Sequence, residues 1–582
     1  MSNTDSSVVE TTPRKKLSIL IVQMGGVDEV LRSLMALKAV RHLYPEMSIQ
    51  VIARKEASGP LKRIEWLDGV LETPKCEAGE DPVLKVAQWI DQVINRNYDV
   101  LANWTFSDRY SRRAAIITSL IPAMVKVGDY VRDDSTMGSC DAWSMYRQAW
   151  AKDPAIDQDI HHTDIITTEL LTILQIHAGD PSPDVGSNTV TSKYFFKNIT
   201  NEQPKAWINR PKGLKWVAVH ADSLSERAAE WVQMVLRRNP DFGVVVIGDA
   251  YLGDALETER VITLGSDLHF DALVSVLSQA SWLVSGKHPI VDLASLVNLR
   301  VFYSPESTSR EFSLKWTEEG PYGNGHVAVS FENEWQPEVA YAAWSFYQGE
   351  WFHKNTLTVE GHFENLGIRD SLKSIQLFKS RIRPANEGGG VCYEFVAGQP
   401  REFEAWMYRV RGQMARAWFC GWLPSIEQEV AKLTLSPELV KRIRSVNDSV
   451  QVIEKLAIQG RNVALELSQC AQKSKTGYLM SVEDRDLIEE HGKKLLEVEA
   501  LIARVIQVEP ELRCLLRWYQ QMMHNLDGQT VAQMAKETMQ AFDLMTEGLE
   551  LVSAYTKRTL DQAKPKSVTS NIRPIRDQDL NS

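Results

Sequence analysis

Short apolar runs alternate with amphipathic helical patterns over the first third of the chain. The run Leu17–Val22 is followed by a glycine-containing turn and by a helical pattern at 28–42 with apolar residues on one face. Further strands are predicted at 49–53, 70–72, 99–103 and 125–127, with a helix at 81–95. Such alternation is typical of a parallel sheet covered by helices. We therefore predict a first Rossmann-like domain at 17–190, after a disordered N-terminus at 1–16.

A second alternating series follows a polar linker. A long helix is predicted at 163–177, and Pro- and Asn-containing sequence at 182–212 separates it from the next strand at 216–220. Later strands are predicted at 244–247, 261–264, 282–285 and 301–303, with helices at 227–238 and 270–280. This pattern predicts a second Rossmann-like domain at 205–345.

The last part of the chain changes from aromatic-rich to helical sequence. We assign 346–399 to a crossover or linker, 400–560 to a helical bundle and 561–582 to a disordered tail. Ser436-Pro437 and the pair Ser481 and Asp484 predict helix starts. Two more helices are predicted at 510–525 and 530–555. The aromatic cluster at 344–352 could form an acceptor platform, but we favour packing, as we do for Trp216 and Trp282.

Composition excludes several classes of protein. Of 582 residues, 44% are hydrophobic and 24% charged, as in soluble globular chains. With 65 basic and 76 acidic residues, the net charge of −11 gives no general attraction to nucleic acid or anionic membranes. The six cysteines are scattered, and no apolar run is long enough for a transmembrane segment. We expect a cytoplasmic protein, with peripheral attachment to the inner membrane as an alternative.

The candidate chemistry lies on the loops that follow the strands. Two doubly wound domains in tandem bind ligands in the crevice at the carboxyl ends of their strands. In the first loop, Gly25 and Gly26 would give a ligand access to the backbone, and Asp28 or Glu29 could accept a proton. Alternatively, the two carboxylates only favour the dipole of the helix that they begin.

An ordered series of segments resembles glycosyltransferase family 9, the heptosyltransferases. The series begins with the strand, glycine loop and helix at 17–45, and it continues through Val125–Gly128, His161-His162, Val217–Ala221, Val244–Gly248 and Ser285–Pro289. It covers about 330 residues, from Leu17 to Tyr347, and leaves the helical C-terminal part outside.

The resemblance implies a GT-B fold and an inverting, metal-independent transfer of a sugar from a nucleotide diphosphate donor to a hydroxyl group. The family's catalytic carboxylate falls on Glu29, with Asp28 beside it as the alternative. Its small hydroxyl residues fall on Asp222 and Ser223, and its phosphate-binding lysine falls on Arg227. A solvated helix-start arginine balanced by acidic neighbours is the other interpretation of Arg227.

The third loop departs from the family pattern. Lys287 and His288 stand where the family has Asp-Thr, and Asp292 stands where it has His. Lys287 could hold a phosphate, and Gly286 would leave the backbone accessible. Asp249 could bond a ribose hydroxyl. We interpret His161-His162 as a helix start rather than a metal site.

Three hypotheses follow from this pattern. The first is a heptosyltransferase-type enzyme with no cofactor or metal, acting on lipopolysaccharide core, another glycan or a protein. The second is a catalytically inactive GT-B scaffold that binds a partner protein through the crevice or the helices, which could also form a homo-oligomer. The third, a nucleotide-sugar epimerase or other α/β enzyme, is weaker because the sequence shows no cofactor fingerprint.

Overall fold

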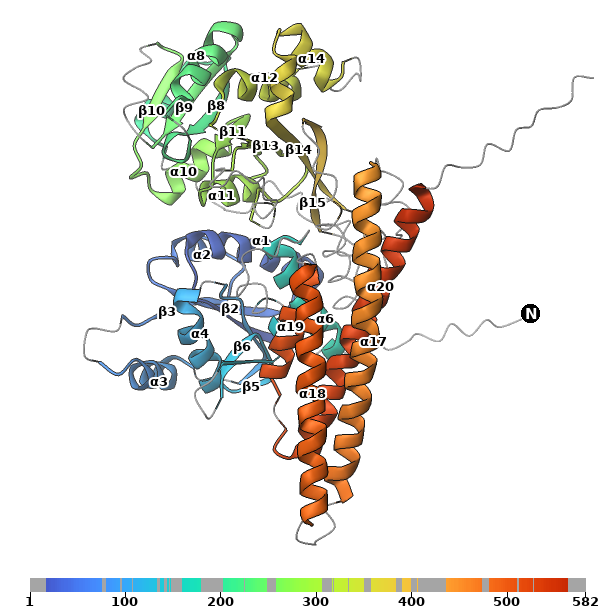
Figure 1. Cartoon of the computed structure of the whole chain (residues 1–582). Coiled ribbons are helices and arrows are strands. Elements are labelled where there is room, and N and C mark those ends of the chain that lie inside the picture. The colour runs from blue at the N-terminus through green and yellow to red at the C-terminus, as the bar shows by residue number, and fades with distance from the viewer. Residues whose placement is uncertain are drawn as a thin grey trace, which may run out of the picture. The chain divides into compact units, whose positions relative to one another are not determined.

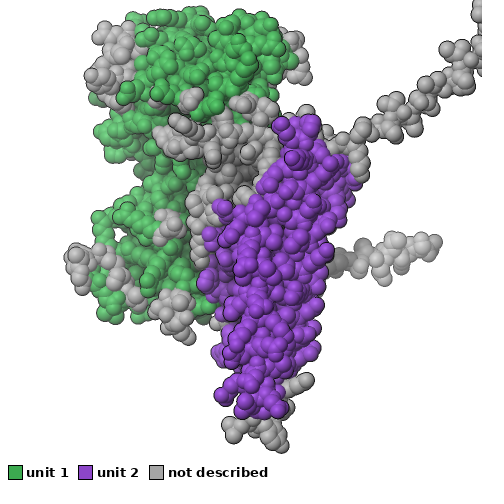
Figure 2. Space-filling model, in the orientation of Figure 1, with its two compact units in different colours: residues 1–400, 419–422 green, residues 401–418, 423–582 purple. Residues whose placement is uncertain are grey.

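The computed structural model divides the chain into two compact units (Figure 2). One unit contains residues 1–400 and 419–422, and the other contains 401–418 and 423–582. The structure describes the chain apart from residues 1–16, 76–79, 95–96, 107, 133–136, 141–143, 146, 148–159, 179–202, 225, 249–257, 306–316, 318, 333, 350–356, 384–389, 399–405, 407–435, 474–480, 510–511, 527 and 564–582.

The first domain is a five-stranded parallel sheet with helices on both faces (Figure 1). Its strands are β1 (Ser18–Gln23), β2 (Ser48–Arg54), β3 (Gly69–Thr73), β4 (Tyr98–Asn103) and β5 (Ala123–Val127), in the order β3-β2-β1-β4-β5. The helices are α1 (Val27–Leu43), α2 (Gly59–Lys62), α3 (Pro82–Val93), α4 (Asp108–Leu120) and α6 (His162–Ala178). A small antiparallel pair, β6 (Asp129–Val131) and β7 (Met137–Ser139), follows β5.

Both faces of this sheet are buried because its central strand is apolar at successive positions. Ile19 and Ile21 of β1 join a core with residues of α1 and α6, whereas Leu20 and Val22 join a core with residues of α3 and α4. Alternate side chains of a strand point to opposite faces, so an uninterrupted apolar run requires a cover on each side.

The second domain repeats this plan and extends it. Its sheet has the order β10-β9-β8-β11-β12-β13-β14-β15. The strands are β8 (Lys215–His220), β9 (Phe242–Ile247), β10 (Val261–Leu264), β11 (Trp282–Ser285), β12 (Arg300–Tyr303), β13 (Val327–Phe331), β14 (Ile375–Ile382) and β15 (Val391–Gly398). The helical elements are α7 (Lys205–Ile208), η2 (Ala221–Ser223), α8 (Ala228–Arg238), α10 (Phe270–Leu277), α11 (Ile290–Leu296), α12 (Pro337–Gln348), α14 (Val359–Asn365) and η4 (Arg369–Ser374).

The segment 346–399 is more than the crossover or linker that the sequence suggested. It contains β14 and β15, which pair antiparallel with each other, and β14 also pairs antiparallel with β13. The two strands therefore add to the second sheet. The described aromatic residues of the cluster at 344–352 are core, as favoured above: Trp344 of α12 is fully buried and lies edge-on to Trp231 of α8, and Phe346 and Tyr347 are buried. Residues 350–352 of that cluster lie outside the described residues. Trp216 and Trp282 are buried as well.

The second unit is helical, as the sequence predicted. Its long helices are α17 (Pro437–Lys473), α18 (Val482–Val508), α19 (Arg513–His524) and α20 (Val531–Ala563). The Ser481 hydroxyl accepts the backbone N–H of Asp484, which confirms the expected cap. The apolar repeat of α17 is buried: Leu439, Ile443, Val446, Val450 and Ile453. Within the described ranges, no helix is both long enough and apolar enough to cross a membrane.

Together, the two doubly wound α/β domains and the helical extension confirm the predicted fold class.

Candidate functional site

The predicted site residues gather where the strand order of each sheet reverses. In the first sheet β1 lies between β2 and β4, and in the second β8 lies between β9 and β11. Loops that leave neighbouring strands on opposite sides of a sheet open a crevice between them, which is where ligands bind in such folds. Asp28 and Glu29 follow β1, Ser223 follows β8, and Gly286, Lys287 and His288 follow β11.

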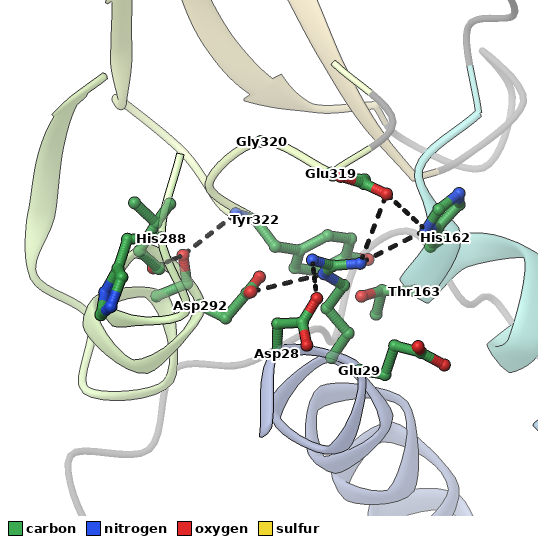
Figure 3. Close-up of polar contacts among 12 residues, drawn as sticks. Asp28, Glu29, His162, Thr163, His288, Asp292, Glu319, Gly320 and Tyr322 are labelled. Atoms are coloured by element: carbon green, nitrogen blue, oxygen red, sulfur yellow. Dashed lines mark hydrogen bonds and ion pairs between the residues drawn. The ribbon is translucent and has the colours of Figure 1, made fainter. Parts of the chain in front are cut away.

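Asp28 and Glu29 are neighbours in the sequence but have different surroundings. The Glu29 carboxylate accepts the backbone N–H of Phe106 at 2.8 Å, and the residue is only 9% exposed. This carboxylate lies so close to Gly25 that a Cβ at position 25 would overlap it. Asp28, by contrast, has a side chain that is 37% exposed and accepts a hydrogen bond from Arg32 Nη2 at 3.0 Å. Figure 3 shows the two carboxylates pointing in different directions.

The cation that organises this region is Arg32, a residue that the sequence analysis missed. It lies one turn after Asp28 on α1, and its side chain is only 7% exposed. Nε lies 3.4 Å from Asp292 Oδ2 of the second domain. Burial alone would lower the pKa of Arg32, but Asp292, Glu319 and Asp28 outweigh burial and raise it. The available sequence signal was a basic residue four positions after Asp28.

Asp292 is a buried carboxyl group whose two oxygens differ in their hydrogen bonds. Oδ2 accepts from Arg32, whereas Oδ1 is buried and has no hydrogen-bond partner among the described residues. Burial, helped by the negative charges of Asp28 and Glu319, raises the pKa of Asp292 to about 7 even though Arg32 opposes the shift. This carboxyl group therefore exchanges a proton near neutral pH.

Lys287 approaches the same cluster from the loop after β11. Its Nζ lies 2.7 Å from Glu319 Oε2, and Glu319 Oε1 lies 3.8 Å from Arg32 Nη1. His162 contributes its Nδ1, which is 3.5 Å from Arg32 Nη1 (Figure 3). Because arginine can only donate, this nitrogen accepts, and the ring is neutral. Burial keeps the pKa of His162 well below its ordinary value, which agrees with that assignment.

The other residues of the third loop contact residues at the end of β8, within the second domain. Ser223 Oγ accepts the backbone N–H of Gly286 at 2.8 Å and lies 3.0 Å from Ser285 Oγ. A Cβ on Gly286 would overlap the Ser223 carbonyl oxygen, so the close approach of these two loops requires glycine there. The His288 ring stacks on His220 with centroids 3.9 Å apart, away from the Arg32 cluster.

One predicted donor-binding residue, Arg227, makes its hydrogen bonds outside this cluster. Arg227 precedes α8, is exposed, and forms hydrogen bonds of 2.9 and 2.7 Å with Glu230. That is the geometry of a helix-start arginine, and a role in donor binding stays a prediction. Asp249 lies outside the residues that the structure describes.

His162 begins α6 and His161 precedes it, so the pair marks a helix start, as expected. His161 Nδ1 accepts the N–H of Thr163, so Nε2 donates to the carbonyl oxygen of Gly320 at 2.9 Å. In the described part of the chain, no three His, Cys, Asp or Glu residues are grouped so that they could hold a metal ion.

Comparison with known proteins finds similar chains among solved structures alone. No protein-family model matches the sequence, and no curated protein matches it. Solved structures similar to the chain include the heptosyltransferase WaaC of E. coli with ADP, which is 15% identical over 57% of this chain and 99% of its own, with a TM-score of 0.39.

Two further structures show the range of these similarities. The glycosyl transferase family 9 protein of Veillonella parvula is 12% identical over 61% of this chain and 97% of its own, with a TM-score of 0.39. A UDP-GlcNAc 2-epimerase of Neisseria meningitidis bound to UDP-GlcNAc is 9% identical over 49% of this chain and 82% of its own, with a TM-score of 0.29. One of these solved structures thus carries the name of family 9, the family that the sequence resembles.

Proposed function

We propose that the chain is a glycosyltransferase that moves a sugar from a nucleotide diphosphate donor to a hydroxyl acceptor with inversion, without a metal. The observation that carries the proposal is the position of Asp28. Its half-exposed carboxylate is held by the buried Arg32 at the strand-order reversal of the first sheet, and Arg32 also contacts Asp292 of the second domain.

Asp28 is the better placed of the two candidate bases. In the proposed reaction the acceptor oxygen bonds to the anomeric carbon while the bond from that carbon to the diphosphate oxygen breaks, and the acceptor proton passes to a carboxylate. Asp28 is open to solvent, whereas Glu29 is buried and bonded to the Phe106 backbone. Glu29 would then position the loop rather than take the proton, although the resemblance to family 9 assigns it that role.

The departing diphosphate requires positive charge and N–H donors. Lys287 is the exposed cation of the third loop, with 69% of its side chain accessible. The close contact between Gly286 and Ser223 keeps the loops after β11 and β8 together beside it. The acceptor, which could be lipopolysaccharide core, another glycan or a protein, and the membrane-peripheral location stay parts of the proposal. The helices of the second unit offer a surface for such an acceptor or for a second copy of the chain.

The test compares three variants of the full chain in a transfer assay with nucleotide sugars. Asp28→Asn should lower kcat by about 10²- to 10⁴-fold, as the loss of a general base does, without weakening donor binding. Glu29→Gln should lower it much less, and Asp370→Asn, an exposed carboxylate paired with Lys373, should have no effect. Full activity of Asp28→Asn together with inactive Glu29→Gln would move the base to Glu29. Full activity of both would refute this site.

A catalytically inactive GT-B scaffold is the second candidate, and one observation favours it. The two cations predicted to receive the diphosphate are both paired with carboxylates of the chain, Lys287 with Glu319 and Arg227 with Glu230. A thermal-shift screen with nucleoside diphosphates and their sugar conjugates separates the candidates, because a ligand that binds only the folded state raises the unfolding midpoint. A raised midpoint supports the enzyme, and an unchanged midpoint with every nucleotide supports the scaffold.

A further inference from the structure

Glu319 is a carboxylate held between cations of the two α/β domains. It lies between β12 and β13, and its side chain is 27% exposed. Oε2 meets Lys287 Nζ at 2.7 Å, and Oε1 lies 3.8 Å from Nη1 of Arg32. Lys287 belongs to the second domain and Arg32 to α1 of the first, so the carboxylate bridges the two domains. His162, being neutral, adds no charge to this pair of cations.

The backbone next to Glu319 is fixed by contacts that do not involve its charge. The carbonyl oxygen of Gly320 accepts a hydrogen bond from His161 at 2.9 Å. The Tyr322 hydroxyl donates to Asp164 at 2.7 Å. These contacts to α6 and the residue before it hold the segment in place, so the Glu319 carboxylate is presented to the cations from a supported position.

Carboxylate and phosphate oxygens accept from the same cationic donors, with similar geometry. We propose that Glu319 occupies the place of a phosphate group: the chain's own carboxylate fills the anion site formed by Lys287 and Arg32, and a diphosphate ligand must displace it. The identity of that ligand rests on the proposed function, because a nucleotide diphosphate is what the transferase would bind. Glu319 would thus lower the affinity of the resting protein for its donor.

A count of charges supports this role. With Asp292 holding its proton, the charges in direct ion-pair contact cancel: Lys287 and Arg32 face the carboxylates of Asp28 and Glu319. Glu29 has the weakest effect among the carboxylates that act on Arg32. Asp292 has a pKa of about 7, so this state is well populated at and below neutral pH. Removing the Glu319 charge makes this group more positive by one unit, and a diphosphate would be attracted to it more strongly.

The experiment measures binding of inorganic pyrophosphate to the full chain by calorimetry at pH 6.5. Glu319→Gln keeps the shape of the side chain and removes its charge, and we expect pyrophosphate to bind about tenfold or more tightly than to the wild type. The matched control is Glu364→Gln, which removes an exposed carboxylate paired with Arg369 in the same domain and should leave the affinity unchanged. Adding Lys287→Gln to Glu319→Gln should abolish the gain.

The result that overturns the inference is the same pyrophosphate affinity in Glu319→Gln and wild type. If Glu319→Gln unfolds at a lower temperature than the wild type, pyrophosphate binding to Glu319→Ala is measured in the same way. An affinity of Glu319→Ala equal to that of the wild type also overturns the inference. Nucleoside diphosphates titrated in parallel separate this inference from the proposed function. Equal nucleotide affinity in wild type and variant refutes the inference alone. Tighter pyrophosphate binding with no nucleotide binding to either protein supports the anion site and refutes the transferase.

Discussion

Replacing Arg32 by glutamine would leave three carboxylates without the cation that they surround. Asp28, Asp292 and Glu319 lie 3.0, 3.4 and 3.8 Å from the guanidinium nitrogens, and the Arg32 and Asp292 side chains are 7% and 3% exposed. Breaking a buried pair by removing one partner costs about 3–5 kcal/mol. At about 2–4 °C of unfolding midpoint per kcal/mol, Arg32→Gln should unfold on the order of 10 °C below the wild type near pH 8.

The loss should shrink on acidification. The pKa of Asp292 in the folded protein is about 7, above the value of about 4 for an unfolded aspartate. Between these two pH values the folded state binds a proton that the unfolded state has released. Stability from this group is therefore complete at low pH and is lost as the pH rises through about 7. Arg32 limits that loss, because it is the cation that opposes the shift. Without it the pKa rises further, and the variant loses more stability than the wild type above pH 7.

Differential scanning calorimetry of both proteins at pH 5 and pH 8 tests this reasoning. The midpoint difference should be clearly larger at pH 8. Arg369→Gln serves as the control, since Arg369 and its partner Glu364 are exposed and such pairs contribute little at either pH. An equal midpoint difference at the two pH values, or none at all, would refute the assignment of Arg32 as the cation that limits the rise in the pKa of Asp292.

The helical unit offers further predictions. Gly460→Ala should destabilise it by about 1–3 kcal/mol, because a Cβ there would overlap the Phe542 ring of α20. Gly492→Ala, on α18 with open space around it, should stabilise it by about 0.5–1 kcal/mol. Urea unfolding followed by circular dichroism at 222 nm distinguishes the two, and the same sign for both would contradict the packing. In the same assay Arg442→Gln should cost about 1–3 kcal/mol, because the buried Glu509 carboxylate loses its cation at 2.7 Å and keeps only the hydroxyls of Ser445 and Ser449 as donors among the described residues. An unchanged midpoint would mean that the pair adds nothing.

The order of strands and helices was predictable because each element carries its own local signal. A short apolar run such as Ile19–Val22, followed by a glycine turn, is typical of a strand buried on both faces, and the 4,3 repeat from Leu439 indicates a packed helix. The strands of 375–398 were missed. Each has polar side chains among its apolar ones, and their pairing with β13 is set by tertiary contacts rather than by local pattern.

The sequence predicted which loops form the site, but it did not predict which side chains contact one another there. The sequence placed Asp28, Lys287 and Asp292 on loops or helix starts at the strand ends, where the fold brings them together. It could not show that Arg32 joins two of them, since a basic residue in an amphipathic helix is usually solvated. Nor could it identify Glu319, whose partners are more than 30 residues away in the chain. The opposite surroundings of Asp28 and Glu29 depend on the Phe106 backbone, which no spacing rule reveals.

The central claim is that the crevice loops of the two α/β domains bind a nucleotide diphosphate. Calorimetric titration of the full chain with a series of nucleoside diphosphates tests it most directly. The account predicts one-to-one binding of at least one of them, weakened by Lys287→Gln and unaffected by Arg369→Gln, which removes an exposed cation paired with Glu364. Absence of binding by the wild type and by Glu319→Gln, with every nucleotide, would contradict it.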